Sequence, residues 1–285
     1  MKPQKFLFIS SSDLYGGGSI VSYNLHKSLV QNGYLSMMVV NNKKSDDDSV
    51  IELQGHIKKF IKDCLLGYIN FPFSYSLAKL LNKVYERFYK IIKKRGREIF
   101  FYPASHKILS LINYKPDVIF LSNIHSNFFD IRLIAKWSKE FHIFYSLSDL
   151  WLFTGHCGIP LDCEKFFIGC GDCPDLTLSP SIPKDKTLEN HFFKKKIIIN
   201  NRLHFIAPSK WVYNISKQIK LNPDSSLSLI PNAIDTKKFS PYDQFISRKE
   251  IGLSKNDFVI LTSAIGFINN PYKDLNTMIK AYKRL

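Results

Sequence analysis

Four cysteines lie close together near the middle of the chain, in the stretch SLSDLWLFTGHCGIPLDCEKFFIGCGDCP. Their spacing is C-x5-C-x6-C-x2-C, over Cys157, Cys163, Cys170 and Cys173. Two thiolates separated by two residues commonly bind a tetrahedral zinc ion. The first two spacings are longer than those of common zinc fingers. A zinc ion that staples this loop is therefore one interpretation of the cluster.

The same cysteines have other interpretations. They could be reduced thiols that pack as small hydrophobic side chains, or they could form one or two disulfides. A catalytic thiol is disfavoured, because no base is placed by the sequence to activate one. His156 adjoins Cys157 and could replace a cysteine as a ligand. The fifth cysteine, Cys64, stands apart, and we expect it to pack in the core.

Polar residues and glycines follow several apolar runs that we expect to be buried strands. The runs are KFLFIS, VIFL, FHIFYS and HFIA. Ligands of open parallel sheets bind beyond the carboxyl ends of the strands, so the residues that follow each run are candidates for a site. The candidates are Gly16, Gly17, Gly18, Asn123, His125, Ser148, Asp149, Trp151 and Ser209.

Strands and helices alternate along the sequence, which predicts the fold class. A strand, a glycine loop, a helix and the strand SMMVVNN open the chain, and strand–helix pairs then recur. Such alternation is typical of a doubly wound α/β sheet with parallel strands and right-handed crossovers. In the first helix, we expect Val21, Leu25, Leu29 and Val30 to face the core, and Gly33 to end the helix.

The glycine loop at residues 15–19 is a candidate anion-binding site. Glycines permit a tight turn and a close backbone approach, and the helix N-terminus that follows offers free N–H groups to an anion such as a phosphate. The sequence GGGS is neither the dinucleotide fingerprint nor a Walker loop. An ordinary tight turn between strand and helix is the alternative interpretation.

Composition and charge narrow the class of protein. Hydrophobic residues make up 45% and charged residues 22%, which is the balance of a globular rather than a disordered chain. The net charge of +16 favours anionic partners. The lysines are spread along amphipathic segments without a reader motif, so we expect no nucleic-acid partner. No leader or membrane-spanning run is apparent, so we expect a cytoplasmic protein.

The segment from His56 to Arg97 is rich in lysines and aromatic residues. We interpret its second half as a basic amphipathic helix, which would lie on the anionic inner face of the cell membrane. An ordinary surface helix with lysine side chains extended over apolar neighbours is an equally good interpretation.

Several segments together resemble one family, the GT-B glycosyltransferases of family 4, and within it the branch that builds bacterial surface polysaccharides of the colanic-acid type. The matching segments are GGGSIVSYNLHKSL, NIH, SLSDLWLFTGHC with the cysteines that follow it, FIAPSKWV, IPNAIDTKKFSP and SAIGFINNPYKDLNTMIKAYK. The resemblance runs almost end to end. The tryptophan and cysteine block is its most specific part, and the glycine pair is the least specific.

The resemblance implies two Rossmann-like domains and a retaining transfer of a sugar from a nucleotide-sugar to a lipid-linked or oligosaccharide acceptor. It implies catalytic roles for Ser148, Asp149 and His125. It implies contacts to the donor from the glycine loop and Lys273, and contacts to the acceptor from Asn123, Trp151 and Ser209. No cofactor or metal is implied for the chemistry, because basic groups and helix dipoles stabilise the leaving diphosphate.

The sequence departs from the family pattern at two motifs and in the extent of its donor-side domain. Ser148 stands where the pattern T-L-H-D-M-W has histidine, and an expected Arg-Lys-Gly reads Tyr272, Lys273 and Asp274. We expect residues 1–240 to form the acceptor-side domain, with a cysteine-rich loop at 151–180. Residues 241–285 would form only the first strand and helix of the donor-side domain. The alternative function is a non-catalytic half that binds an acceptor or a partner chain.

Overall fold

A computed structural model describes residues 4–53, 87, 90–91, 93–98, 102–125, 128–263, 266, 270 and 272–284. Most of the predicted basic segment from His56 to Arg97 lies outside these residues, as does Cys64. The chain divides into two compact units, Met1–Pro231 and Asn232–Leu285, which are described separately below. The expected domain boundary at residue 240 lies within the second unit.

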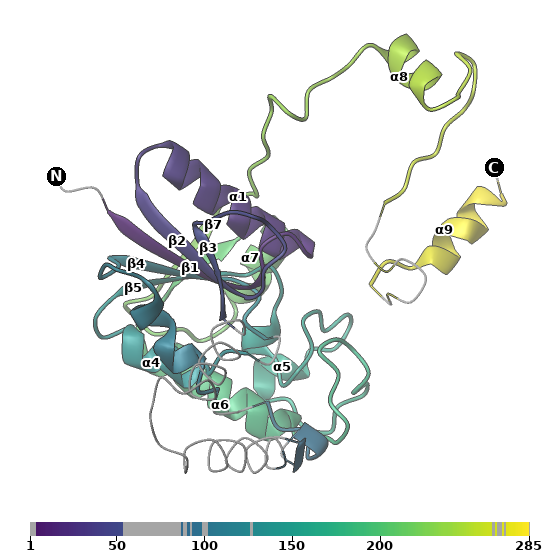
Figure 1. Cartoon of the computed structure of the whole chain (residues 1–285). Helices are drawn as coiled ribbons and strands as arrows, with labels where there is room; N and C mark the ends of the chain where they lie inside the picture. Colours follow the sequence, from purple (N-terminus) through teal and green to yellow (C-terminus); the bar gives the residue numbers. More distant parts are fainter. Residues whose placement is uncertain are drawn as a thin grey trace. The chain divides into compact units, whose positions relative to one another are not determined.

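The first unit alternates strands with helices (Figure 1). Its strands are β1 (Lys5–Ser12), β2 (Leu35–Asn42), β3 (Val50–Glu52), β4 (Val118–Leu121), β5 (His142–Ser146), β6 (His204–Ala207) and β7 (Ser226–Leu229). Its α-helices are α1 (Gly17–Gln31), α4 (Arg132–Trp137), α5 (Lys165–Ile168), α6 (Thr187–Asn200) and α7 (Lys210–Ser216). Two 3-10 helices are η1 (Ser105–Leu111) and η2 (Trp151–Phe153).

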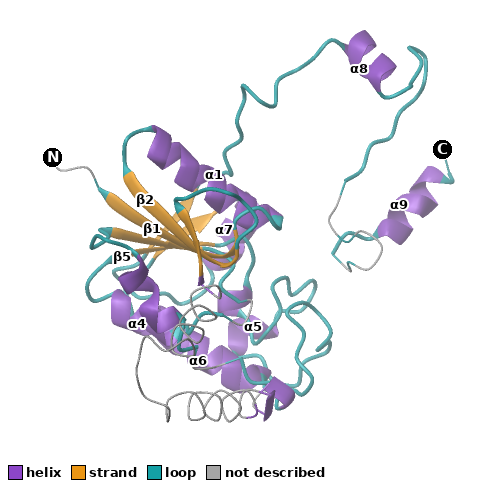
Figure 2. Ribbon diagram, in the orientation of Figure 1, coloured by secondary structure: helices purple, strands orange, loops and turns teal. Residues whose placement is uncertain are grey.

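The described strands form one open sheet of seven strands in the order β3-β2-β1-β4-β5-β6-β7 (Figure 2). All of its pairs are parallel. The order reverses direction between β1 and β4, which makes this point the topological switch of a doubly wound sheet. The predicted α/β class with a parallel Rossmann-like sheet is therefore confirmed.

The central strands β1, β2 and β4 are buried on both faces, as their continuous apolar runs predict, whereas the edge strand β7 is largely exposed. Along β1, Leu7 and Ile9 contribute to one core cluster, while Phe8 between them contributes to the cluster on the opposite face. Helix α1 packs on the face of Phe8, and helices α4 and α6 lie on the other face (Figure 2). Because all strands are parallel, their carboxyl ends lie at one edge of the sheet, and so do the polar residues that follow them.

Helix α1 buries a different face from the one predicted. Its fully buried residues are Ser19, Ser22 and His26, whereas Leu25 and Val30 are exposed. Buried polar groups are tolerated where they find partners, and the His26 ring is 2.7 Å from Ser36 Oγ and 2.9 Å from Ser49 Oγ. The predicted face was wrong because apolar periodicity does not reveal such polar contacts. The predicted end of the helix is confirmed, with Gly33 at φ 80°.

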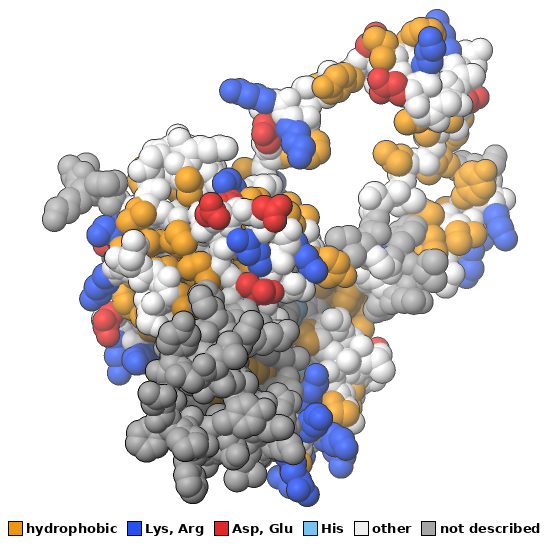
Figure 3. All heavy atoms as spheres, in the orientation of Figure 1, with side chains coloured by type: hydrophobic (Ala, Val, Ile, Leu, Met, Phe, Trp, Pro, Cys, Tyr) orange, Lys and Arg blue, Asp and Glu red, His pale blue; other side chains and the backbone are white. Residues whose placement is uncertain are grey.

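The second unit contains helices α8 (Gln244–Glu250) and α9 (Leu275–Tyr282). Helix α9 was predicted, and α8 was not. The strand predicted from DFVILTSAIGF is absent over the described residues 257–263. A strand needs a neighbour for its backbone N–H and C=O groups, and the described part of this unit supplies none. Phe258 and Leu261 are consequently exposed. Hydrophobic side chains are also visible on the surface of the described residues in Figure 3.

Candidate functional site

The carboxyl ends of β1, β4 and β5 bring three predicted site residues into contact. A Cβ atom added at Gly18 would lie 2.6 Å from Asn123 Nδ2 and 2.8 Å from both the Cβ and the Oγ of Ser148. No real side chain fits at such distances, so the first turn of α1 can approach the next two strands only with glycine here. The glycine loop, the end of β4 and the end of β5 therefore form one site.

Ser19 lies at the centre of the hydrogen bonds beneath this site. Its Oγ is 3.2 Å from Ser10 Oγ, and it accepts a hydrogen bond from Asn123 Nδ2 at 3.3 Å. Asn123 itself has a φ of 48°, a left-handed conformation that asparagine adopts more readily than most residues. Sequence reasoning placed Ser19 at the end of the glycine loop but gave it no role of its own, because the sequence does not show which side chains it contacts.

His125 and Asp149 form a pair at the same edge of the sheet. His125 Nε2 is 3.1 Å from Asp149 Oδ2, and the side chains are 23% and 16% exposed. The other carboxylate oxygen, Oδ1, accepts a hydrogen bond from the Trp151 backbone at 2.9 Å. The carboxylate is therefore held in place while the imidazole remains accessible to a ligand. Both residues were predicted as catalytic, and the structure brings them together.

Trp151 lies in the core and is only 2% exposed. Its ring is 5.8 Å from the ring of His125, and its Nε1 donates to Glu98 Oε1 at 2.9 Å. Burial leaves no open ring face for the acceptor contact that we predicted. The geometry instead gives Trp151 the role of supporting His125 and Asp149 from below.

A buried ion pair holds Trp151 in turn. Lys194 Nζ is 2.8 Å from Glu98 Oε2 and lies 4.1 Å from the centre of the Trp151 ring, and the lysine side chain is 1% exposed. Neither charged residue was predicted. Lys194 belongs to a run of three lysines in a helix. Such a run predicts a solvent-exposed helix face, so the sequence gives no indication that Lys194 is buried.

The N-terminus of α1 is open to an anion. Its N-cap is Gly16, at φ 87°, which has no side chain to satisfy the first backbone N–H groups, and the first turn contains no acidic residue. The partial positive charge of a 15-residue helix therefore has no side-chain counterpart at this end. Gly17 has no atom within 4 Å of an added Cβ, so the loop is uncrowded on that side.

Ser209 and Lys273, the remaining predicted site residues, have other local surroundings. Ser209 is the N-cap of α7, and its Oγ accepts a hydrogen bond from the Val212 backbone at 3.3 Å. Lys273 is exposed in the second unit, next to Asp274. The Asp274 carboxylate caps α9 by accepting from the Thr277 backbone at 3.1 Å. Hydrogen bonds from the Thr277 side chain, the largest influence, and from the Thr277 backbone lower the pKa of Asp274. Asp274, the acidic neighbour of Lys273, thus serves as the N-cap of α9.

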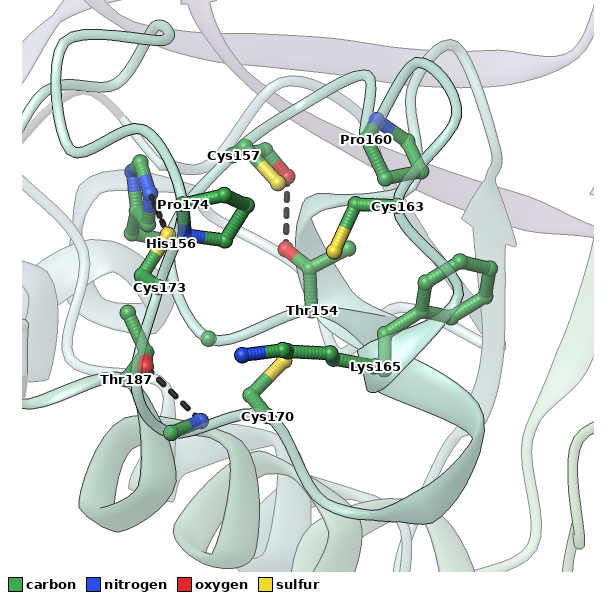
Figure 4. A pocket seen from close by; sticks show the side chains of 13 residues that line it. Thr154, His156, Cys157, Pro160, Cys163, Lys165, Cys170, Cys173, Pro174 and Thr187 are labelled. Atoms are coloured by element: carbon green, nitrogen blue, oxygen red, sulfur yellow. Dashed lines mark hydrogen bonds between the residues drawn. The ribbon is translucent and has the colours of Figure 1, made fainter.

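The four clustered cysteines line one small cavity together with His156 and Thr187 (Figure 4). All four are free thiols. Burial raises the pKa of Cys157 to about 11 and that of Cys170 to about 12, and it also raises the pKa of Cys173. A nucleophilic cysteine needs the opposite shift.

The predicted metal site is not preformed. Within the part of the chain that the structure describes, no three or more His, Cys, Asp or Glu side chains are already arranged to hold a metal ion. The Sγ of Cys173 lies 3.4 Å from His156 Nε2. The zinc interpretation therefore remains a prediction.

Comparison with models of known protein families and with curated proteins gave no match. Among the described residues, no helix combines the length and the hydropathy needed to cross a membrane.

Proposed function

We propose that the chain is a retaining glycosyltransferase, which transfers a sugar from a nucleotide-sugar to a lipid-linked or oligosaccharide acceptor. The observation that carries the proposal is the His125–Asp149 pair at the carboxyl edge of the sheet, where the uncapped N-terminus of α1 also lies. An ionisable pair beside an anion-binding helix end suits the transfer of a group away from a diphosphate. The sequence resemblance supports the same class.

In this proposal, the first turn of α1 binds the donor diphosphate. The backbone N–H groups near Gly17 and Gly18 would donate to phosphate oxygens, and the helix dipole would stabilise the charge that grows as the diphosphate leaves. Gly18 is required because the turn packs directly on Asn123 and Ser148. The net charge of +16 would assist the approach of an anionic donor.

The His125–Asp149 pair would act on the acceptor side of the reaction. When Nε2 donates to Asp149, the neutral ring keeps Nδ1 as a proton acceptor, and the carboxylate stabilises the imidazolium that forms. The transfer breaks the bond between the anomeric carbon and the diphosphate oxygen and forms a bond to the acceptor oxygen, whose proton His125 receives. His125 would thus supply the imidazole that the family pattern has at position 148.

The test is release of nucleoside diphosphate from UDP-glucose, UDP-galactose and GDP-mannose in the presence of a bacterial lipid extract. We expect His125→Ala and Asp149→Asn each to lower turnover by about 100-fold, the usual size of a general acid–base contribution. Activity of His125→Ala at the level of the unchanged chain would contradict the proposed role of the pair.

Binding of UDP and GDP by calorimetry provides a second measurement. Gly18→Ala should weaken nucleotide binding, while Gly17→Ala, a matched glycine with open space around it, should not. Nucleotide binding without turnover in any donor and acceptor combination would favour the non-catalytic alternative. Absence of both binding and turnover would overturn the glycosyltransferase proposal.

A further inference from the structure

The cysteine-rich loop is long and contains little regular structure. Between η2 and α6, from residue 154 to residue 186, the chain has a single four-residue helix, α5. Loops of this length are uncommon in compact domains unless they are functional, and they need some other means to stay ordered. The apolar side chains buried in this loop are few, and they are Pro160, Phe166, Leu178 and Ile182.

Three separate parts of this loop bring the thiols to one cavity (Figure 4). In Figure 4, the sulfur atoms of Cys157, Cys163 and Cys170 point into the same space, and that of Cys173 points to His156. Rotation between staggered χ1 positions moves a cysteine sulfur by about 3 Å, so the side chains can converge without a new path for the backbone.

The backbone around the last two cysteines has an unusual conformation. Gly169, Cys170, Gly171 and Asp172 have φ values of 148°, 56°, 89° and 46°. Non-glycine residues adopt positive φ at a cost, and such positions concentrate where a ligand or a tight contact determines the chain path. Residues 169–173 thus form a compact turn, here called the knuckle, that carries Cys170 and Cys173. Two cysteines separated by two residues commonly bind a metal from such a turn.

Neighbouring groups fix the backbone of this knuckle. Gly171 N donates to Thr187 Oγ1 at 2.9 Å, and Cys173 N donates to Asp185 Oδ2 at 2.7 Å. The Cys170 backbone N–H donates to the Lys165 carbonyl at 2.8 Å. Hydrogen bonds that orient the residues bearing the ligands are a general property of metal sites.

From this arrangement we propose that Cys157, Cys163, Cys170 and Cys173 bind one zinc ion as a tetrahedral structural site. Each thiol loses its proton to solvent as its sulfur–zinc bond forms, at about 2.3 Å. The site is independent of the proposed transfer chemistry. It connects to the catalytic edge through the backbone, because Leu150 N, next to Asp149, donates to the Gly158 carbonyl at 2.7 Å.

The test uses the full chain, expressed with zinc and purified under reducing conditions. We expect about one zinc per chain by elemental analysis. After exchange for Co²⁺, we expect the intense visible bands of a tetrahedral site and a sulfur-to-cobalt charge-transfer band. Absence of both zinc and a cobalt–thiolate spectrum in the unchanged chain would overturn the proposal, and so would disulfides detected by mass spectrometry under these conditions.

Variants then identify the ligands. Cys170→Ser and Cys173→Ser should each weaken Co²⁺ binding more than about tenfold, while Cys64→Ser, the cysteine outside the cluster, should leave it unchanged. Circular dichroism of each variant distinguishes loss of a ligand from loss of the fold. Binding retained in Cys163→Ser but lost in His156→Asn would overturn the four-cysteine ligand set.

Discussion

Gly18 is the residue at which the site is most tightly packed. A methyl group there would meet Asn123 and Ser148 at 2.6 and 2.8 Å, so Gly18→Ala must displace α1 or the ends of β4 and β5. We expect a loss of about 1–3 kcal/mol in the free energy of unfolding, measured by urea denaturation, because inserted methyl groups strain packed regions by such amounts.

Gly17→Ala is the matched control for that substitution. Its added methyl group meets no atom within 4 Å, and alanine is a better helix former than glycine. The variant should be as stable as the unchanged chain, or more stable by up to about 1 kcal/mol. Equal destabilisation by the two substitutions would show that contact with Asn123 and Ser148 does not determine the effect.

The sequence predicted the glycine loop, but only one of the two physical reasons for its glycines. The pattern of glycines after a strand predicts a close backbone approach to a phosphate. It cannot predict that Gly18 also makes room for two other strand ends, because that contact joins residues more than a hundred positions apart. The pairing of His125 with Asp149 is similar, since each was predicted from its own strand end and only the sheet order brings them together.

Among the elements, α6 contacts the described residues 96–98 before η1 partly through a buried ion pair between Lys194 and Glu98. Lys194→Met would leave the Glu98 carboxylate without its cation in a site where both side chains are largely buried. We expect a loss of about 3–5 kcal/mol in the free energy of unfolding, as is typical when one partner of a buried pair is removed.

The double variant Lys194→Met with Glu98→Gln tests the cause. Glutamine carries no charge, and its carbonyl oxygen can still accept the hydrogen bond from Trp151 Nε1. The double variant should therefore be more stable than Lys194→Met alone. If its loss equals or exceeds the sum of the two single losses in chemical denaturation, an unpaired charge is not the reason for the destabilisation.

The contact of α1 with β2 predicts a dependence of stability on pH. Burial lowers the pKa of His26 to about 4 from its usual value of about 6.5, so the folded state holds the ring neutral between Ser36 and Ser49. The contribution of the neutral His26 ring to the free energy of unfolding is complete above pH 6.5. It is lost as the pH falls toward 4, because the unfolded chain then binds a proton that the folded chain does not. The full loss is roughly 3 kcal/mol.

Urea denaturation at several pH values between 4 and 7 measures this effect. The slope of the unfolding free energy against pH gives the number of protons taken up on unfolding. In His26→Gln this number should be smaller by close to one. Burial also lowers the pKa of His191 to about 4, so part of the slope should remain in that variant. An unchanged slope in His26→Gln would contradict the assignment.

The predictability of each element follows from what stabilises it. The runs before Ser122 and Ser146 are buried on both faces, so their continuous apolar character was sufficient to predict β4 and β5. Strand β3 is only three residues long and was missed. The 257–263 segment has the same apolar character as the true strands, yet it is no strand among the described residues, because strand formation depends on a neighbour that composition does not reveal.

At the scale of the whole molecule, the connection between the two units is an exposed stretch of the chain. Residues 229–246 are exposed throughout and include Lys237 and Lys238. We expect limited trypsin digestion to cut first after these lysines, and mass spectrometry should then detect a resistant fragment ending near the boundary at Pro231. Initial cleavage within the first unit would contradict this order of local stability.

The unpaired apolar segment at residues 257–263 has a consequence for the chain in solution. Phe258 is 86% and Leu261 is 89% exposed, and the stretch FVILTS combines high β-propensity with no charge and no proline. Such segments pair between molecules and nucleate aggregation. A single charge in the middle of the stretch, as in Ile260→Lys, should raise the concentration at which the chain stays monodisperse, while the thermal unfolding of the first unit remains unchanged.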